Sequence, residues 1–263
     1  MPAVYNAYAM PAVSDVTDEP ALSQTVKAQL RLRELIVGGD LKPGQRIAEL
    51  SLVERIGVSR TPIRMALVRL QEEGLLDALP GGGFVVKDFS EDDIHDAIEL
   101  RGTLEGLAAR LAAERGVSPV LVAEARDCLE RIDQLLAEPE LTDASFSGYV
   151  KQNGRLHDLL AEMAGSAVVR RQLDRVKTLP FASPNGFVFA TALSPRSRDA
   201  LVVAQAQHRA LVDAIVGREG ARAEALMREH ARMAHQNLRE ALQSHKSLQK
   251  IPGASLIRRR STR

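Results

Sequence analysis

Residues 49–74, ELSLVERIGVSRTPIRMALVRLQEEG, decide the fold of the N-terminal part of the chain, because two helical patterns follow one another across a single glycine. The first pattern predicts a short helix over 49–56 that ends at Gly57, and the second predicts a helix over 59–73. A short helix, a tight turn and a second helix are typical of a helix-turn-helix, which places its second helix in the major groove of DNA.

The second of these helices carries basic charges and no acidic ones between Ser59 and Leu70. Arg60 and Arg64 lie four residues apart and therefore share a helix face. Arginine can make bidentate bonds to guanine, whereas the hydroxyls of Ser59 and Thr61, which also suit a helix N-cap, can bind phosphates. On an isolated helix such arginines would more simply be solvated charges, but their place on the second helix of a helix-turn-helix favours DNA contact.

The sequence on either side of this stretch completes a winged helix. Upstream, the apolar spacing of 22–37 predicts a helix that ends at a pair of glycines. Downstream, two short strand patterns over 75–79 and 84–87 flank a turn that contains Gly82 and Gly83. Glycines at the tip allow the hairpin backbone to approach DNA closely, as a wing does.

From residue 90 onward every periodic segment is helical. Ser90 and Asp93 give a capping-box signal for the start of a long helix. Further helices are predicted over 119–137, 144–165, 167–177, 200–217 and 220–244. The irregular stretch 178–197 is of a length that is more often functional than not. We therefore predict a mainly α fold, with an N-terminal winged helix-turn-helix followed by an all-α antiparallel helical bundle.

Net charge differs between segments, although 35 basic and 34 acidic residues leave +1 overall. The segments 1–26, 27–89, 90–246 and 247–263 carry −3, +2, −3 and +5. Bulk charge therefore cannot drive DNA binding, and a nucleic acid must be met by a local patch. We predict a disordered N-terminal arm (1–21), a winged-helix DNA-binding domain (22–89), an effector-binding and dimerisation domain (90–246) and a basic tail (247–263). The tail is either solvated or in contact with DNA phosphates.

Composition excludes several classes of protein. The sequence has no apolar run of about 18 residues, which excludes a membrane span. Cys128 is the only cysteine, which excludes an internal disulfide framework and a cysteine-rich zinc site. The first residues lack the pattern of a secretory signal, so we expect a cytoplasmic protein.

Three histidines, His157, His208 and His230, fall in three different predicted helices, each beside apolar residues at helical spacing. We expect them to point inward. Asn153 lies one turn before His157 on the same face, so its amide oxygen and the imidazole could reach one ion. Three imidazoles and an oxygen suit zinc, nickel or a similar divalent metal. The alternative is three unrelated core histidines, each satisfied by a hydrogen bond.

Several spaced motifs resemble the winged helix of the GntR family of bacterial transcription regulators. These motifs are LKPGQRI at 41–47, GVSRTPIR at 57–64, EGL at 73–75 and GGFV at 82–85. The resemblance implies that operator DNA is contacted by Ser59, Arg60, Thr61 and Arg64, and that the wing tip is formed by Gly82 and Gly83. The chain departs from the family at Leu50, where some members have a DNA-contacting arginine, and at Met65, which replaces the usual glutamate.

Beyond residue 90 the chain resembles the helical effector domain of the FadR subgroup, the FCD domain, with IELR at 98–101 and LE at 104–105 opening it. Members that bind metal use an aspartate and a histidine one turn apart and two later histidines. The matching positions are Asn153, His157, His208 and His230. Asparagine in place of aspartate lowers the negative charge and should weaken cation affinity.

Arg101 falls on the apolar stripe of its helix, where a guanidinium needs a partner. That partner is either Glu105, one turn on, or the carboxylate of a bound effector. The resemblance favours the effector, and the motifs DAIELRG at 96–102 and LEG at 104–106 look most like regulators that answer aromatic acids such as vanillate. The aromatics Phe146, Tyr149, Phe181, Phe187 and Phe189 could line or close an effector pocket, and core packing is equally plausible for Phe146 and Tyr149.

The leading interpretation is a ligand-responsive transcriptional regulator, a repressor and not an enzyme. A homodimer would bind a near-palindromic double-stranded operator and respond to a small carboxylic acid. One alternative is a metal-dependent hydrolase fused to a winged helix, although the sequence offers no general base beside the histidines. Another is a winged helix used only for protein contacts, against which the Arg60 and Arg64 face argues.

Overall fold

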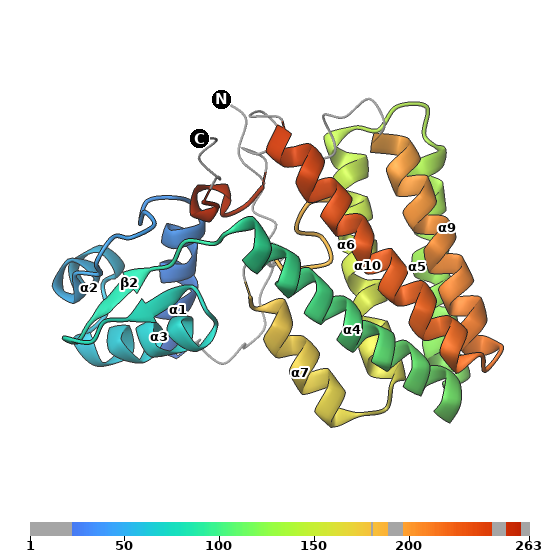
Figure 1. The fold of residues 1–263 in the computed structure, drawn as a ribbon, viewed down its shortest axis with the longest axis horizontal. Helices are drawn as coiled ribbons and strands as arrows, with labels where there is room; N and C mark the ends of the chain where they lie inside the picture. The colour runs from blue at the N-terminus through green and yellow to red at the C-terminus, as the bar shows by residue number, and fades with distance from the viewer. Residues whose placement is uncertain (1–22, 180, 189–196, 244–250, 259–263) are drawn as a thin grey trace, which may run out of the picture. The chain divides into compact units, whose positions relative to one another are not determined.

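The computed structural model describes residues 23–179, 181–188, 197–243 and 251–258, and the chain divides into two compact units. One unit ends at Asp93 and also takes in the segment from Pro252, and the other is Ile94–Ile251. Helices dominate both units (Figure 1), which confirms the mainly α fold. The arm predicted over 1–21 lies outside the described residues. Among the described helices, none is long and apolar enough to cross a membrane.

The first unit contains the elements that the sequence predicts for a winged helix. They are α1 (Gln24–Val37), α2 (Glu49–Ile56), α3 (Arg60–Glu72), β1 (Leu76–Ala78) and β2 (Phe84–Val86). The two strands pair in antiparallel fashion, with Leu76 opposite Val86 and Ala78 opposite Phe84. Gly57, in the left-handed conformation at φ 76°, ends α2 and makes the tight turn into α3, a backbone shape that glycine adopts without strain.

The core of this unit lies between α1 and α3. The helices bury apolar side chains of matching spacing: Leu32, Leu35 and Ile36 from α1, and Ile63, Leu67 and Leu70 from α3. The expected N-capping by hydroxyls is wrong, however. Ser59 occupies the N-cap position of α3 without a side-chain cap bond, and Thr61 lies inside the helix. Both hydroxyl groups are thus spare for another partner.

The segment that follows the helical unit returns to the winged helix. A short 3₁₀ turn, η1 (Ala254–Leu256), buries Leu256 to 1% exposure. The backbone N–H of Phe89 donates to the carbonyl of Leu256 at 2.8 Å, and the N–H of Arg258 donates to the carbonyl of Phe89 at 2.8 Å. Of the basic tail predicted over 247–263, residues 251–258 are described, and those from Pro252 belong to the first unit.

The second unit is a bundle of long helices (Figure 1). Its elements are α4 (Glu91–Arg115), α5 (Pro119–Ala137), α6 (Asp143–Met163), α7 (Ala167–Lys177), α9 (Ser197–Val216) and α10 (Gly220–Gln243). The expected capping box begins α4, because the hydroxyl of Ser90 accepts from the N–H of Asp93 and the Asp93 carboxylate accepts from the N–H of Ser90. Helix α5 packs on both α6 and α9, and α9 packs on α10.

Close contact between α4 and α10 positions the polar residues of the bundle interior. A Cβ atom added to Gly102 would lie 2.6 Å from the Cβ of Ala231, so the two backbones approach more closely there than a larger residue would allow. Arg101 and His230 directly neighbour these two residues in sequence. The contact therefore places Arg101 of α4 and His230 of α10 at the same height along the bundle, so that both side chains can reach the same part of its interior.

Candidate functional site

The residues predicted to contact DNA lie exposed at the start of α3. Ser59, Arg60, Thr61 and Arg64 are all exposed. The Arg64 side chain is 72% exposed, and its Nε lies 3.7 Å from a carboxylate oxygen of Glu49 on α2. Because an exposed ion pair of this kind contributes little, Arg64 can exchange its partner for another anion at small cost.

The wing tip presents bare backbone. Gly82 and Gly83 are exposed and have φ values of 88° and 86°, in the region that L side chains rarely adopt. The Gly82 N–H donates to the carbonyl of Leu79 at 2.8 Å, and the Leu79 N–H donates to the carbonyl of Gly83 at 3.0 Å. Nothing lies within 4 Å of a Cβ built on either glycine, so the tip is open on both.

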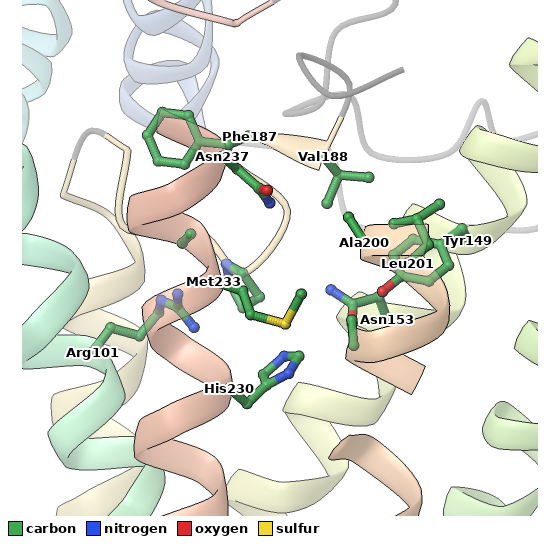
Figure 2. Close-up of a pocket in the computed structure, with 13 residues that line it drawn as sticks. Arg101, Tyr149, Asn153, Phe187, Val188, Ala200, Leu201, His230, Met233 and Asn237 are labelled. Carbon is green, nitrogen blue, oxygen red and sulfur yellow. The ribbon is translucent and has the colours of Figure 1, made fainter. Parts of the chain in front are cut away.

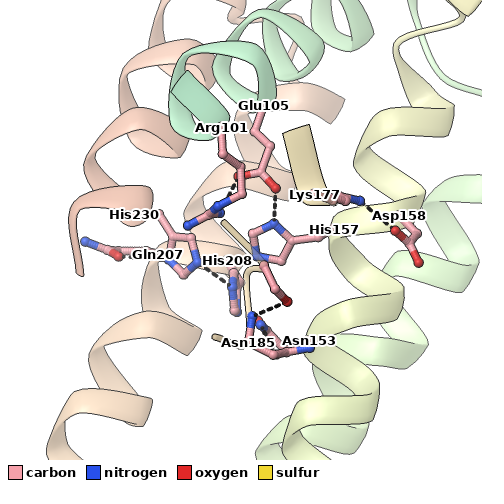
Figure 3. A network of polar contacts seen from close by, with 11 residues as sticks. Arg101, Glu105, Asn153, His157, Asp158, Lys177, Asn185, Gln207, His208 and His230 are labelled. Carbon is pink, nitrogen blue, oxygen red and sulfur yellow. Dashed lines mark hydrogen bonds and ion pairs between the residues drawn. The ribbon is translucent and has the colours of Figure 1, made fainter. Parts of the chain in front are cut away.

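The second unit brings the three predicted histidines together. His157 of α6, His208 of α9 and His230 of α10 each offer one nitrogen, and these nitrogens all lie within 4.8 Å of one another. Figure 3 shows the three rings converging from their helices. His157 and His208 are buried at 1% and 0% exposure, and the Nε2 atoms of His208 and His230 are 3.1 Å apart. The expectation that the three side chains point inward is met.

An oxygen atom lies against the Nδ1 of each ring. His157 Nδ1 lies 2.8 Å from the Glu105 carboxylate. Nδ1 of His208 lies 3.3 Å from the side-chain oxygen of Gln205, and Nδ1 of His230 lies 3.1 Å from that of Gln207. In the tautomer in which each Nδ1 donates to its neighbouring oxygen, each Nε2 carries the lone pair, which is how metal-binding histidines are oriented.

The electrostatics keep two of the three histidines, His208 and His230, neutral. Burial, and then the neighbouring His157, lower the pKa of His208 to about 3. Burial likewise holds the pKa of His230 well below its usual value. Burial alone would raise the pKa of Glu105, but the charges of Arg101 and His157 outweigh it and lower that pKa to about 2. Neutral His208 and His230 beside one carboxylate are in the protonation states that a divalent cation requires of its ligands.

The Nε2 of His157 is buried and has no hydrogen-bond partner among the described residues. An unpaired buried acceptor of this kind carries the cost of its lost hydration unless another group meets it. A zinc or nickel ion held by His157, His208 and His230 would meet it, so the residues present fit a divalent metal.

Asn153 lies at the edge of the same cluster. It is 2% exposed, and its Nδ2 donates to the side-chain oxygen of Asn185 at 2.8 Å, while its own Oδ1 is buried without a partner in the part of the chain that the structure describes. Asn185 in turn donates to the carbonyl of Val150 at 3.0 Å. The bond to Asn185 fixes the Asn153 amide and leaves its oxygen as a second unsatisfied acceptor.

Arg101 is buried at 2% exposure and is paired with Glu105, its Nη1 lying 2.6 Å from a carboxylate oxygen. Glu105 therefore bridges Arg101 and His157. The Nε of Arg101 is buried, and none of the residues that the structure describes accepts a hydrogen bond from it. Of the two partners considered from sequence, Glu105 is the one that Arg101 contacts in the structure.

A pocket opens beside the histidine cluster. Its lining includes Arg101, Tyr149, Asn153, Phe187 and His230. Figure 2 shows Arg101 and Asn153 on opposite sides of this pocket, with Met233 between them. The lining combines the cationic Arg101 and the amide of Asn153 with apolar and aromatic side chains, which suits a small acid with a hydrophobic body.

The predicted aromatic cluster divides between pocket and core. Tyr149 and Phe187 line the pocket, Phe146 packs in the apolar core, and Phe181 stacks on Phe187 with ring centroids 6.3 Å apart. Phe189 lies outside the described residues. The sequence reasoning missed Asn185, Gln205 and Gln207. Amide side chains are common on any helix or loop, so residue type gives no signal. What marks these three is their contact with a site residue on the same or another segment, and that contact is visible only in the fold.

Two family profiles match most of the described chain. Residues 22–86 match the profile for bacterial regulatory proteins of the gntR family, and residues 96–233 match the FCD domain. The second match alone covers more than half of the chain. It contains all of the candidate metal residues, and the first contains the whole helix-turn-helix and wing.

Comparison with individual proteins agrees with these matches. The HTH-type transcriptional regulator YdhC of Bacillus subtilis is 29% identical over 149 residues, which are 57% of this chain and 64% of that relative. The HTH-type transcriptional repressor GlaR of Escherichia coli is 27% identical, over 76% of this chain and 88% of that protein. The solved structure of E. coli McbR/YncC has the same fold, with a TM-score of 0.58 and 20% identity over 84% of this chain and 98% of that one. The chain therefore belongs to the GntR family of bacterial regulatory proteins and carries an FCD domain after its winged helix.

Proposed function

We propose that the protein is a transcriptional repressor that binds double-stranded operator DNA and answers a small carboxylic acid. The observation that carries this proposal is the exposed pair Arg60 and Arg64 at the start of α3, in the same unit as the open glycine tip of the wing. An exposed cationic helix start and a bare hairpin in one unit suit the major groove and the adjacent phosphates. The name of the relative GlaR supports repression.

Operator recognition assigns different tasks to these groups. Arg60 and Arg64 bind guanine edges or phosphates. The hydroxyls of Ser59 and Thr61, which make no capping bond to α3, bind phosphates. A homodimer places two winged helices on the two halves of a near-palindromic operator, since two-fold symmetry of the protein is mirrored in its site.

The effector site lies in the second unit, where the pocket meets the histidines. The unpartnered Nε of Arg101 and the amide of Asn153 would bind the effector, and Tyr149 and Phe187 would pack on its body. His157, His208 and His230, with the amide oxygen of Asn153, would hold a zinc or nickel ion. When bound, that ion supplies open coordination positions for a carboxylate. The effector regulates DNA binding to the extent that it binds two arrangements of the protein with different affinity.

A metal-dependent hydrolase gains no support from this site. Glu105 is the carboxylate closest to the histidines, but its two oxygens are already bonded to Arg101 and His157. A general base has to be within reach of a water molecule and able to take its proton. Glu105, held with a pKa of about 2, is a structural anion instead.

The test of DNA binding is a comparison of arginines on one helix. A duplex selected from random-sequence DNA by the full-length protein is titrated with wild type, Arg60→Ala and Arg64→Ala. Loss of a base contact should cost about 1–3 kcal/mol of binding free energy, and loss of a phosphate contact should reduce the salt dependence. Arg69→Ala is the matched control, because Arg69 on the same helix donates to Gln29 of α1. Equal affinity of all four proteins would refute the assignment.

A further inference from the structure

The helix-turn-helix exposes large apolar side chains next to its arginines. Met65 of α3 is 50% exposed, and Leu50 of α2 is 58% exposed. Single exposed apolar residues are ordinary on a protein surface. Two exposed apolar residues on the helix-turn-helix that carries Arg60 and Arg64 are less ordinary, because this part of the protein is proposed to contact DNA.

Helical geometry groups these side chains. Thr61 and Met65 are four residues apart in α3 and so occupy one face, which is exposed at both positions. The ion pair between Arg64 and Glu49 brings the start of α2 next to the second turn of α3, and Leu50 directly follows Glu49. The exposed surface of the helix-turn-helix is therefore cationic at Arg60 and Arg64 and apolar at Leu50, Met65 and the methyl group of Thr61.

The major groove contains one kind of apolar group, the C5 methyl of thymine. Aliphatic and threonine side chains recognise that methyl by packing on it, and methionine adapts its shape to such a contact because it is unbranched and polarizable. We propose that Met65, with Thr61 and Leu50, reads thymine methyl groups in the operator. This proposal rests on the proposed DNA-binding function and adds to it a base preference, A·T pairs, beside the guanines that Arg60 and Arg64 suit.

The arrangement favours DNA over a protein as the occupant of this surface. Arg60 and Arg64 are exposed on either side of one helical turn, and no carboxylate other than Glu49 lies within 4 Å of them among the described residues. A protein partner of this surface would have to supply anions around an apolar centre. The major groove supplies both, since phosphates line its edges and methyl groups project from its floor.

The experiment removes single methyl groups from the DNA. In the duplex selected by the wild-type protein, each thymidine is replaced in turn by deoxyuridine, which lacks only the C5 methyl. We expect wild-type affinity to fall about fourfold at one or two thymines of each half-site, the factor for losing one buried methyl-sized group. The same replacements should leave the affinity of Met65→Ala or Leu50→Ala unchanged at the thymine that each residue reads.

Two controls keep the result specific. The Arg60→Ala protein should bind DNA more weakly overall but keep the full sensitivity to deoxyuridine, because Arg60 is not one of the apolar side chains proposed to contact thymine methyl groups. Leu30→Ala removes a leucine of the same unit that is 45% exposed but lies on α1, and it should behave as wild type.

The outcomes separate this inference from the function it rests on. Failure to select any duplex overturns the DNA-binding function and the inference together. A selected duplex whose deoxyuridine variants all bind wild type within about 1.5-fold overturns the inference alone. So does methyl sensitivity that persists in both Met65→Ala and Leu50→Ala, and in that case a change in oligomeric state of these variants would identify a protein as the occupant.

Discussion

Glu105 joins two other buried side chains in the interior of the second unit. It is 1% exposed and bonds Arg101 through one oxygen and His157 through the other (Figure 3). A buried guanidinium is tolerable only while its counter-charge remains, because removal of one partner leaves an uncompensated charge out of water. The pair is thus a weak source of net stability but a strong constraint on the residues around it.

Replacing Glu105 should therefore be far more damaging than its pairwise contact suggests. We expect Glu105→Ala to lower the free energy of unfolding by about 3–5 kcal/mol, measured by denaturant titration. Asp127→Ala is the matched control, because Asp127 pairs with Arg131 one turn away with both side chains 57% exposed, and it should cost less than about 1 kcal/mol. Equal losses in the two variants would show that Arg101 is hydrated or otherwise paired.

The histidine cluster leads to a prediction about metal content. Protein purified without chelator should contain about one zinc or nickel ion per chain, as measured by elemental analysis, and His208→Ala should lose it. Gln205→Ala, which removes the oxygen beside His208 Nδ1, should weaken metal affinity about 10–100-fold while keeping all three ligands. Metal content that is the same in His208→Ala as in wild type would exclude the site.

The charge of this site is a second, independent test. Because Asn153 is neutral, Asn153→Asp should raise affinity for the ion, the opposite direction to His208→Ala. Competition with a coloured chelator would measure this change. Unchanged or weaker affinity in Asn153→Asp would mean that the bond to Asn185 holds the side chain away from the ion.

At the scale of elements, the helices could be predicted closely and their interior partners could not. The 3.6-residue apolar period marks α1 to α7, α9 and α10, since each helix buries one stripe. The inward direction of His157, His208 and His230 was likewise predictable, as each lies among apolar neighbours, but their convergence was one of two alternatives that the sequence left open. The glutamine and asparagine partners were not, because their role follows from the packing of helices that are distant in sequence. The missing cap on α3 follows from local backbone geometry that side-chain type alone does not determine.

The close crossing of α4 and α10 leads to a prediction of its own. Gly102→Ala would place a Cβ 2.6 Å from that of Ala231, so the helices must separate or shift. We expect a loss of about 1–3 kcal/mol in unfolding free energy, typical of overpacking. The control is Gly81→Ala, since nothing lies within 4 Å of a Cβ built there and its φ is ordinary. If Gly102→Ala were as stable as this control, the backbones would not be in contact.

At the scale of the whole molecule, the chain passes between its two units twice. It leaves the winged helix near Asp93 and returns to it at Pro252. The return is outside both family matches, which cover 22–86 and 96–233. The sequence showed this segment only as part of a basic tail, because three apolar residues, Ile251, Leu256 and Ile257, are too few and too irregularly spaced to form a periodic pattern.

This returning segment should be part of the folded winged helix and not an appendage. Leu256 is 1% exposed, its carbonyl accepts from the N–H of Phe89, and Ile257 forms a parallel bridge with Phe89. We therefore expect Leu256→Ala to lower the stability of the first unit by about 2–5 kcal/mol, and to speed hydrogen exchange at the Phe89 amide. Arg258→Ala should do neither, because its ion pair with Asp88 spans 3.5 Å between side chains that are 62% and 43% exposed. Protection of the Phe89 amide that survives Leu256→Ala would mean that the segment rests on the unit without stabilising it.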